Sequence, residues 1–269
     1  MKSFHDRFWF PAPVRPLTTC CWLTAVVVAL AAAARPASAA PLLAVDVNDR
    51  TEVDADPANT VPGFSPFQLT GTTAAVPNTT QDVDGFTMTV TAVNAAGQPQ
   101  GGIDDRDRAT PSNSPGFAQL YDDFIFTATG VGAGGGIDLS IVSNGNLAPN
   151  TPYLVSIYAF DTGSTAAPQP RSAAWFDGNN ADAPLLVTSF AGAALPTADD
   201  QYRFTGTALT DSAGNLLLRG RNTTPNGPTG GITPGVFLNG LEVNPVPEPA
   251  SLCLFGVAAV LFGLRPPRR

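Results

Sequence analysis

The sequence predicts an all-β fold, an antiparallel β-sandwich, and three observations support this. The chain has 269 residues and contains 26 glycines and 26 prolines, residues that interrupt helices and form turns. Only 13% of its residues are charged, so few lysines and glutamates are available for the exposed faces of helices. Short runs rich in β-branched and aromatic residues recur between Gly, Pro, Asn and Asp, as in proteins built from strands.

Ten segments have the composition of strands. The clearest lies within 85–93, where apolar side chains fall at every second position, as a half-buried strand requires. About ten strands over roughly 200 residues fit a jelly roll, in which two antiparallel sheets bury their inner faces, and an immunoglobulin-like sandwich is the alternative. In chain order the expected strands are 42–47, 85–93, 120–128, 136–143, 152–160, 173–176, 184–190, 201–209, 215–219 and 235–243.

One segment carries a family resemblance in the predicted body. The run NLAPNTPYLVSIYAFD at 146–161 is similar to the loop-to-strand segment of galactose-binding-like and fibronectin-like domains, in which a Leu-x-Pro-x-Thr-x-Tyr turn precedes a central strand. The last expected strand, 235–243, resembles the closing strand of such jelly rolls. The resemblance implies a fold and does not identify a ligand, because these sandwiches serve many functions.

The first 39 residues have the pattern of a secretory signal peptide. Lys2, Arg7 and Arg15 precede an apolar run at 20–34, and Ala-Ser-Ala at 37–39 supplies the small residues of a signal-peptidase site. We therefore expect export, with signal peptidase as a partner and cleavage after position 39.

Residues 245–269 combine a proline-rich spacer, an apolar run at 250–264 and a basic end. The spacer contains Pro247, Glu248 and Pro249, and the basic residues are Arg265, Arg268 and Arg269. This arrangement resembles the PEP-CTERM sorting signal of Gram-negative envelope and exopolysaccharide-associated proteins.

The resemblance implies a partner and a location. In that family an exosortase, a membrane-embedded cysteine protease, recognises the Pro-Glu-Pro element, a short membrane helix and the basic tail. Here Pro247, Glu248 and Pro249 match the motif, 251–264 the single membrane helix and the three arginines the tail. Since basic residues favour the cytoplasmic side, we expect initial anchoring in the inner membrane with the C-terminus cytoplasmic and 40–244 in the cell envelope or outside the cell.

The expected body, 40–244, contains no cysteine, histidine or lysine, because all three cysteines and the one histidine lie in the two terminal segments. This composition excludes Ser-His-Asp and Cys-His nucleophiles, the usual zinc sites, haem, iron–sulfur centres and disulfides within the body. What remains is carboxylate chemistry and the coordination of hard cations by oxygen.

The body is strongly acidic. It has twenty aspartates and glutamates against seven arginines, a net charge of −13. A phosphate backbone would be repelled, and there is no basic stripe with interleaved aromatic residues, so nucleic acid is not an expected partner.

Two acidic segments are candidate sites for structural Ca²⁺, and no other cofactor is expected. Asp46 and Asp49 offer oxygen ligands near the first strand, while Asp104, Asp105 and Asp107 lie in a predicted loop. Solvated acidic or salt-bridged loops are the alternative, because Arg106 and Arg108 interleave with the second group and EF-hand spacing is absent from the first.

A third candidate site is a sugar platform. Trp175 could stack on a sugar ring while Asp177 and Asn179 bond its hydroxyls. The alternative is that Trp175, the one tryptophan of the body, packs in the core.

These patterns favour a non-enzymatic exported protein of the envelope or extracellular matrix that binds polysaccharide. The alternative is a carboxylate-dependent glycoside hydrolase or lyase acting on exopolysaccharide, which requires an acid and a base facing each other in a cleft.

Overall fold

The computed structural model describes residues 40–49, 59–69, 78–100, 102–108, 110–111, 116–127, 134–163, 171–191, 193–222 and 235–247. All of them belong to the unit Ala40–Arg269. The expected signal peptide and sorting helix lie outside these residues. Within them, no helix has the length and apolar character needed to cross a bilayer.

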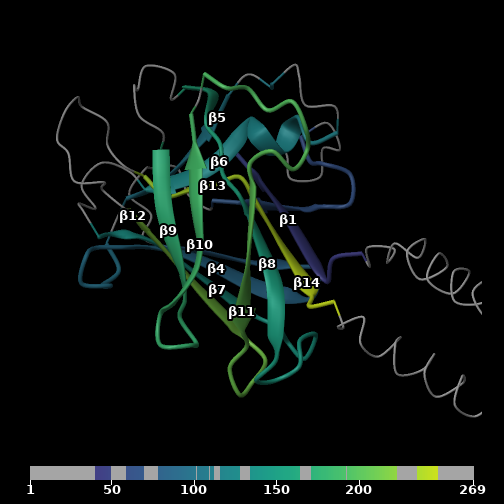
Figure 1. Ribbon diagram of the computed structural model, residues 1–269, viewed down its shortest axis with the longest axis vertical. Coiled ribbons are helices and arrows are strands. Elements are labelled where there is room, and N and C mark those ends of the chain that lie inside the picture. Colours follow the sequence, from purple (N-terminus) through teal and green to yellow (C-terminus); the bar gives the residue numbers. More distant parts are fainter. Residues whose placement is uncertain are drawn as a thin grey trace, which may run out of the picture. The chain divides into compact units, whose positions relative to one another are not determined.

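The described residues form three sheets, which confirms the all-β fold. All neighbouring strands in them are antiparallel except β1 and β2, which are parallel. Figure 1 shows how the strands are arranged. The five-stranded sheet has the order β11 (Arg203–Leu209), β8 (Pro152–Tyr158), β14 (Gly240–Pro245), β1 (Leu43–Asn48), β2 (Ser65–Gln68). The six-stranded sheet has the order β10 (Ala183–Phe190), β9 (Arg171–Asp177), β12 (Leu216–Asn222), β7 (Gly136–Val142), β4 (Phe86–Val93), β3 (Asn78–Val83). The small sheet has the order β13 (Phe237–Leu238), β6 (Asp123–Thr127), β5 (Ile103–Asp107). A 3₁₀ turn, η1 (Gln119–Tyr121), lies between β5 and β6 in the chain.

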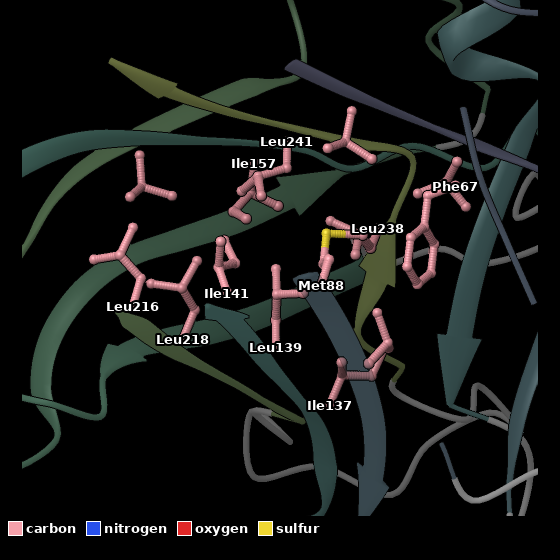
Figure 2. Packing of buried hydrophobic residues seen from close by; sticks show 14 of the residues in the cluster. Phe67, Met88, Ile137, Leu139, Ile141, Ile157, Leu216, Leu218, Leu238 and Leu241 are labelled. Atoms are coloured by element: carbon pink, nitrogen blue, oxygen red, sulfur yellow. The ribbon is translucent and has the colours of Figure 1, made fainter. Parts of the chain in front are cut away.

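The main core lies between the two large sheets. In β4, Phe86, Met88 and Val90 are buried while the threonines between them are only partly buried, so the strand turns one face inward. Burial alternates in the same way in β7 and β12, whereas β8 and β14 are buried on both faces and direct every second side chain into this core. Apolar side chains from both sheets thus form one cluster. Figure 2 shows Ile141 and Leu218 of the six-stranded sheet with Ile157 and Leu241 of the five-stranded sheet in this layer. Burial of these side chains is the main favourable contribution to folding.

Three strands were not expected from the sequence: β2, β3 and β5. Their sequences, SPFQ, NTTQDV and IDDRD, are short or polar and lack a run of β-branched and aromatic residues. The predicted loop around Asp104, Asp105 and Asp107 is therefore an edge strand of the small sheet, held by its pairing with β6.

A second apolar cluster lies on the other side of β8. Ile157 belongs to the main core, but the next residue, Tyr158, packs with Tyr121, Phe160 and Tyr202. We call this cluster the aromatic layer; its rings contact one another with centroids 4.6 to 6.4 Å apart. It consists of Phe64, Phe117, Tyr121, Phe124, Phe126, Tyr158, Phe160, Phe190, Tyr202 and Phe237.

Hydrogen bonds fix the loops that cover this layer. The Asp199 carboxylate accepts bonds from the backbone N–H groups of Gly116 (2.9 Å) and Phe117 (3.0 Å). The Tyr121 hydroxyl donates to the backbone oxygen of Asp199 at 2.8 Å. The segment before η1 is thereby joined to the loop that precedes β11, although they lie about 80 residues apart in the sequence.

Asn239 joins β13 of the small sheet to β14 of the five-stranded sheet. Its side chain is fully buried and bonds to two other strands or loops: Oδ1 accepts from the N–H of Phe160 at 2.7 Å, and Nδ2 donates to the backbone oxygen of Asp123 at 2.8 Å. A side chain on the next residue would not fit, since a Cβ on Gly240 would lie 2.7 Å from the backbone oxygen of Val45. The chain thus changes sheets at a position with few acceptable residues.

The loop between β11 and β12 is closed by Asp211. Its Oδ1 accepts bonds from the backbone N–H groups of Asn215 and Ala213, both at 2.8 Å. These bonds stabilise the ionised carboxylate and lower the pKa of Asp211, with the Asn215 N–H making the largest contribution.

We predict that Asn239→Ala destabilises the fold by about 2 to 5 kcal/mol, because the Phe160 N–H and the Asp123 carbonyl are left buried without their partner. Chemical unfolding measures the difference in free energy. The matched control is Asn180→Ala at an exposed position, for which we expect a change below about 0.5 kcal/mol. Equal effects of the two substitutions would show that the Asn239 side chain does not hold the junction.

We also predict that the contribution of Asp211 depends on pH. Its pKa in the folded state lies below the ordinary value of 3.8, so its stabilisation is complete above that value and is lost as the pH falls below it. Asp211→Ala should lower the melting temperature at neutral pH, and the difference from wild type should shrink at acid pH. Asp211→Asn, which keeps an acceptor but does not titrate, is the control. A difference of the same size at both pH values would contradict the prediction.

Candidate functional site

A group of polar side chains lies on the outer side of the five-stranded sheet, on three adjacent strands. The strand register places Arg203 of β11 beside Tyr158 of β8, Thr205 of β11 beside Ser156 of β8, and Ser156 beside Glu242 of β14. Paired residues in antiparallel strands project to the same face, so the five side chains share one surface. We call it the Arg203–Glu242 face.

Hydrogen bonds connect these side chains into one network. The Arg203 guanidinium forms an ion pair with Glu242, and its Nε donates to Ser156 Oγ at 3.0 Å. Ser156 Oγ and Thr205 Oγ1 lie 2.9 Å apart within hydrogen-bonding distance. The Tyr158 hydroxyl donates to Glu242 Oε1 at 3.2 Å. Each polar group therefore has an orientation fixed by its neighbours.

The network is partly open to solvent. The side chain of Arg203 is 34% exposed and that of Glu242 is 11% exposed. Burial, followed by the negative charge of Glu242, raises the pKa of the Tyr158 hydroxyl above its ordinary value. Tyr158 therefore stays neutral and acts as a donor, which leaves Glu242 as the charged acceptor of the pair.

Two aromatic rings flank the network. Phe64 and Phe117 are partly buried, lie 5.3 Å apart edge to face, and each contacts the ring of Tyr158 at 6.0 Å. A surface that combines ring edges with a carboxylate, a guanidinium and hydroxyl groups can bond the hydroxyls of a sugar and contact its C–H groups.

The predicted sugar platform at Trp175 is wrong. The Trp175 side chain is fully buried in the main core, where a Cβ on Gly220 of the neighbouring strand would lie 3.0 Å from its ring. A buried ring offers no face to a ligand. Its sequence position, inside an alternating strand, places it on the inward face with Ala173 and Asp177.

Asp177 and Asn179 connect turns rather than face solvent. Asp177 Oδ2 accepts a bond from the N–H of Leu209 at 2.7 Å, and Oδ1 accepts from the N–H of Asn179 at 3.0 Å. The Asn179 amide donates to the backbone oxygens of Leu209 (3.0 Å) and Asn215 (2.8 Å). These two side chains therefore hold the end of β9 against the β11–β12 connection.

The structure does not gather the second group of calcium candidates into a cage. Asp104, Asp105 and Asp107 lie on one strand, where Asp104 and Asp105 project to opposite faces. Over all the residues with described positions, no three acidic side chains form a group that could hold a metal ion.

The first calcium candidates lie beside undescribed residues. Asp46 is buried and its Oδ2 accepts a bond from the N–H of Val61 at 2.7 Å, while Asp49 is nearly buried. Since 50–58 lie outside the described residues, calcium binding at Asp46 and Asp49 stays a prediction.

The sequence contains a partial sign of the Arg203–Glu242 face. The alternation Arg-x-Thr-x-Thr at 203–207 shows that one side of β11 is polar. The partner carboxylate is 39 residues further along the chain and becomes a neighbour only through the strand order β11-β8-β14. No local pattern indicates that order.

The described chain ends at Pro247, so Glu248, Pro249, Arg265, Arg268 and Arg269 lie outside the structure's description. Pro247 itself follows the last residue of β14 by two positions. The expected sorting segment, 245–269, therefore begins at the last residue of β14, a strand in the middle of the five-stranded sheet.

Comparison with solved structures gives distant likenesses. The ANXUR1 extracellular domain from Arabidopsis thaliana has 13% identity and a TM-score of 0.37, over 65% of this chain and 56% of that one. The CBM22-1–GH10 modules of the Clostridium thermocellum endo-1,4-β-D-xylanase 10B, complexed with xylohexaose, have 5% identity and a TM-score of 0.31, over 55% of this chain and 27% of that one. The chain thus spans less than two thirds of either structure, and the likenesses are too weak to indicate a ligand.

Comparison of sequences is informative at the C-terminus. No curated protein matches the chain. Residues 245–269 match the family model of the PEP-CTERM protein-sorting motif, as the proline-rich spacer, apolar run and basic end led us to expect. The chain therefore carries a PEP-CTERM sorting motif at its C-terminus, which implies a protein exported to the cell envelope or beyond.

Proposed function

We propose that this protein is a non-enzymatic component of the cell envelope or extracellular matrix that binds polysaccharide through the Arg203–Glu242 face. The observation that carries the proposal is the network of Arg203, Glu242, Ser156 and Thr205 beside the rings of Phe64 and Phe117. Arg203 and Thr205 are exposed, and the buried Ser156 and Glu242 hold them in place. Groups already oriented by one another lose little conformational freedom when a sugar binds, which favours affinity.

The proposal includes a jelly-roll topology for the body. The chain crosses between the two large sheets from β7 to β8, from β8 to β9, from β10 to β11 and from β11 to β12. Repeated crossing of this kind is how double-sheet jelly rolls are built. It places β8 between β11 and β14, so that the four network residues on β8 and β11 lie on the same side of the sheet as Glu242 of β14.

The proposal also includes the route of export. Signal peptidase removes residues 1–39, the helix at 251–264 holds the protein in the inner membrane with its C-terminus in the cytoplasm, and an exosortase then processes the tail. The sorting motif at 245–269 supports this route, as does the signal-peptide pattern at the N-terminus.

We predict that substitution of Pro247, Glu248 and Pro249 by alanine in the full chain blocks tail processing in a host that contains an exosortase, because the recognition element is lost. The protein should then stay in the membrane fraction with its tail, as judged by its mass. Alanine substitution of Pro196 and Thr197, a loop in the body, is the control and should leave processing unchanged. Normal processing of the first variant would show that the motif is not the recognition element.

We predict that the purified protein binds neutral polysaccharide and that Thr205→Val weakens this binding about fivefold to tenfold, through loss of one oriented hydroxyl. Affinity electrophoresis in gels that contain dextran, xylan or cellulose derivatives measures the dissociation constant. Thr80→Val, an exposed threonine on the six-stranded sheet, is the matched control.

Two results would contradict the binding proposal. One is the absence of retardation by every polysaccharide, and the other is equal affinity of wild type and Thr205→Val. Release of new reducing ends from a polysaccharide, abolished by Glu242→Gln, would instead support the hydrolase or lyase alternative.

A further inference from the structure

Three arginines pack on three phenylalanines of the aromatic layer, all of which belong to strands of the small sheet. The guanidinium carbon of Arg106 lies 5.2 Å from the centroid of the Phe126 ring, that of Arg108 5.8 Å from Phe124, and that of Arg171 5.5 Å from Phe237. We call these six residues the arginine–phenylalanine surface.

The three rings form one platform. Phe126 and Phe237 are stacked at 6.0 Å, and Phe124 contacts them at 5.7 and 5.2 Å. Each guanidinium is thus placed on one of three rings that contact one another. A guanidinium above a ring is held by the ring quadrupole, while the N–H groups at its edge remain directed outward.

This concentration of positive charge is unusual in the chain. Residues 40–244 contain seven arginines and no lysine, and their net charge is −13. Three of the seven arginines meet on this one surface.

The charges on this surface are not equivalent. Arg108 donates through Nε to Asp161 at 3.0 Å, which neutralises part of its charge. Burial lowers the pKa of Arg171, and the nearby Asp161 acts in the opposite direction. Arg106 is exposed on the edge strand β5 and presents its guanidinium to solvent. A second carboxylate, Asp104, lies half-buried on the same side of the sheet, because it is paired with Phe126.

We propose that the arginine–phenylalanine surface binds the carboxylate groups of an acidic, uronate-containing polysaccharide, with Arg106 as the main contact. Guanidinium groups pair with carboxylates through two parallel hydrogen bonds, which neutral sugars cannot form. The inference rests on the proposed function in that the ligand is a polysaccharide. The arginine–phenylalanine surface and the Arg203–Glu242 face consist of different residues, so the test of one surface can fail while the test of the other succeeds.

The position of this surface suits an extended ligand. The small sheet adjoins the Asn239 end of β14, whereas the chain leaves the body at the other end of that strand, at Pro245–Pro247 (Figure 1). The surface therefore lies away from the point at which the tail begins.

The test compares binding of the full protein to polygalacturonate and to neutral dextran at low ionic strength. We expect Arg106→Gln to weaken binding to polygalacturonate about fivefold to tenfold and to leave binding to dextran unchanged. Arg219→Gln, an arginine on the outer face of the six-stranded sheet paired with Asp182, is the matched control and should change neither. Melting temperatures of the variants establish that they are folded.

A second substitution is expected to act in the opposite direction. Asp104→Asn removes the opposing negative charge and should strengthen binding to polygalacturonate, while Arg106→Lys, which keeps the charge but loses the planar fork, should weaken it. Added salt should weaken the binding of wild type more than that of Arg106→Gln.

Four results would overturn the proposal: equal affinity of wild type and Arg106→Gln for polygalacturonate, weaker binding by Asp104→Asn, tighter binding of dextran sulfate than of polygalacturonate, or binding to double-stranded DNA alone. In one combination of results, Thr205→Val leaves binding to neutral polysaccharide unchanged while Arg106→Gln weakens binding to polygalacturonate. That combination would support binding of an acidic polysaccharide and contradict binding of a neutral one at the Arg203–Glu242 face.

Discussion

The structure depends on one crossing, at which the chain passes from the small sheet to the five-stranded sheet through Asn239. On one side of this residue, Phe237 belongs to the aromatic layer and Leu238 to the main core. On the other side, Leu241 returns to the main core and Glu242 projects to the outer face. Core residues 238 and 241 are three positions apart, so side chains do not alternate strictly between the two faces at Asn239. The two buried hydrogen bonds of the Asn239 side chain compensate for this irregularity.

The crossing also separates two apolar regions with different compositions. The core between the large sheets is mainly aliphatic and is closed by both sheets. The aromatic layer is covered instead by loops fixed through Asp199 and Tyr121. Polar groups occur at both ends of this layer: the Arg203–Glu242 network beside Tyr158, and the three arginines beside Phe124, Phe126 and Phe237. Tyrosines and phenylalanines thus support both proposed binding surfaces, since their rings are large and stiff.

The sequence was sufficient for the fold class and for most strands, and insufficient for the sites. The alternation in Phe86–Val93 correctly predicted a half-buried strand. The pattern did not predict β3 and β5, because an edge strand can carry polar residues on both faces. The residue type of Trp175 left both a sugar platform and core packing open, and its place in an alternating strand put it in the core. Arg203 and Glu242, like Arg171 and Phe237, meet through sheet order and long-range packing, which local patterns do not encode.

The exit of the tail from β14 has a mechanical consequence. β14 is hydrogen-bonded on both sides, to β8 and to β1. If a polymer held the far end of the body while the tail was still attached to the membrane, the pulling force would run along this strand. Its interstrand bonds would then be loaded together in shear instead of being opened one at a time, the arrangement in which a sheet resists extension best.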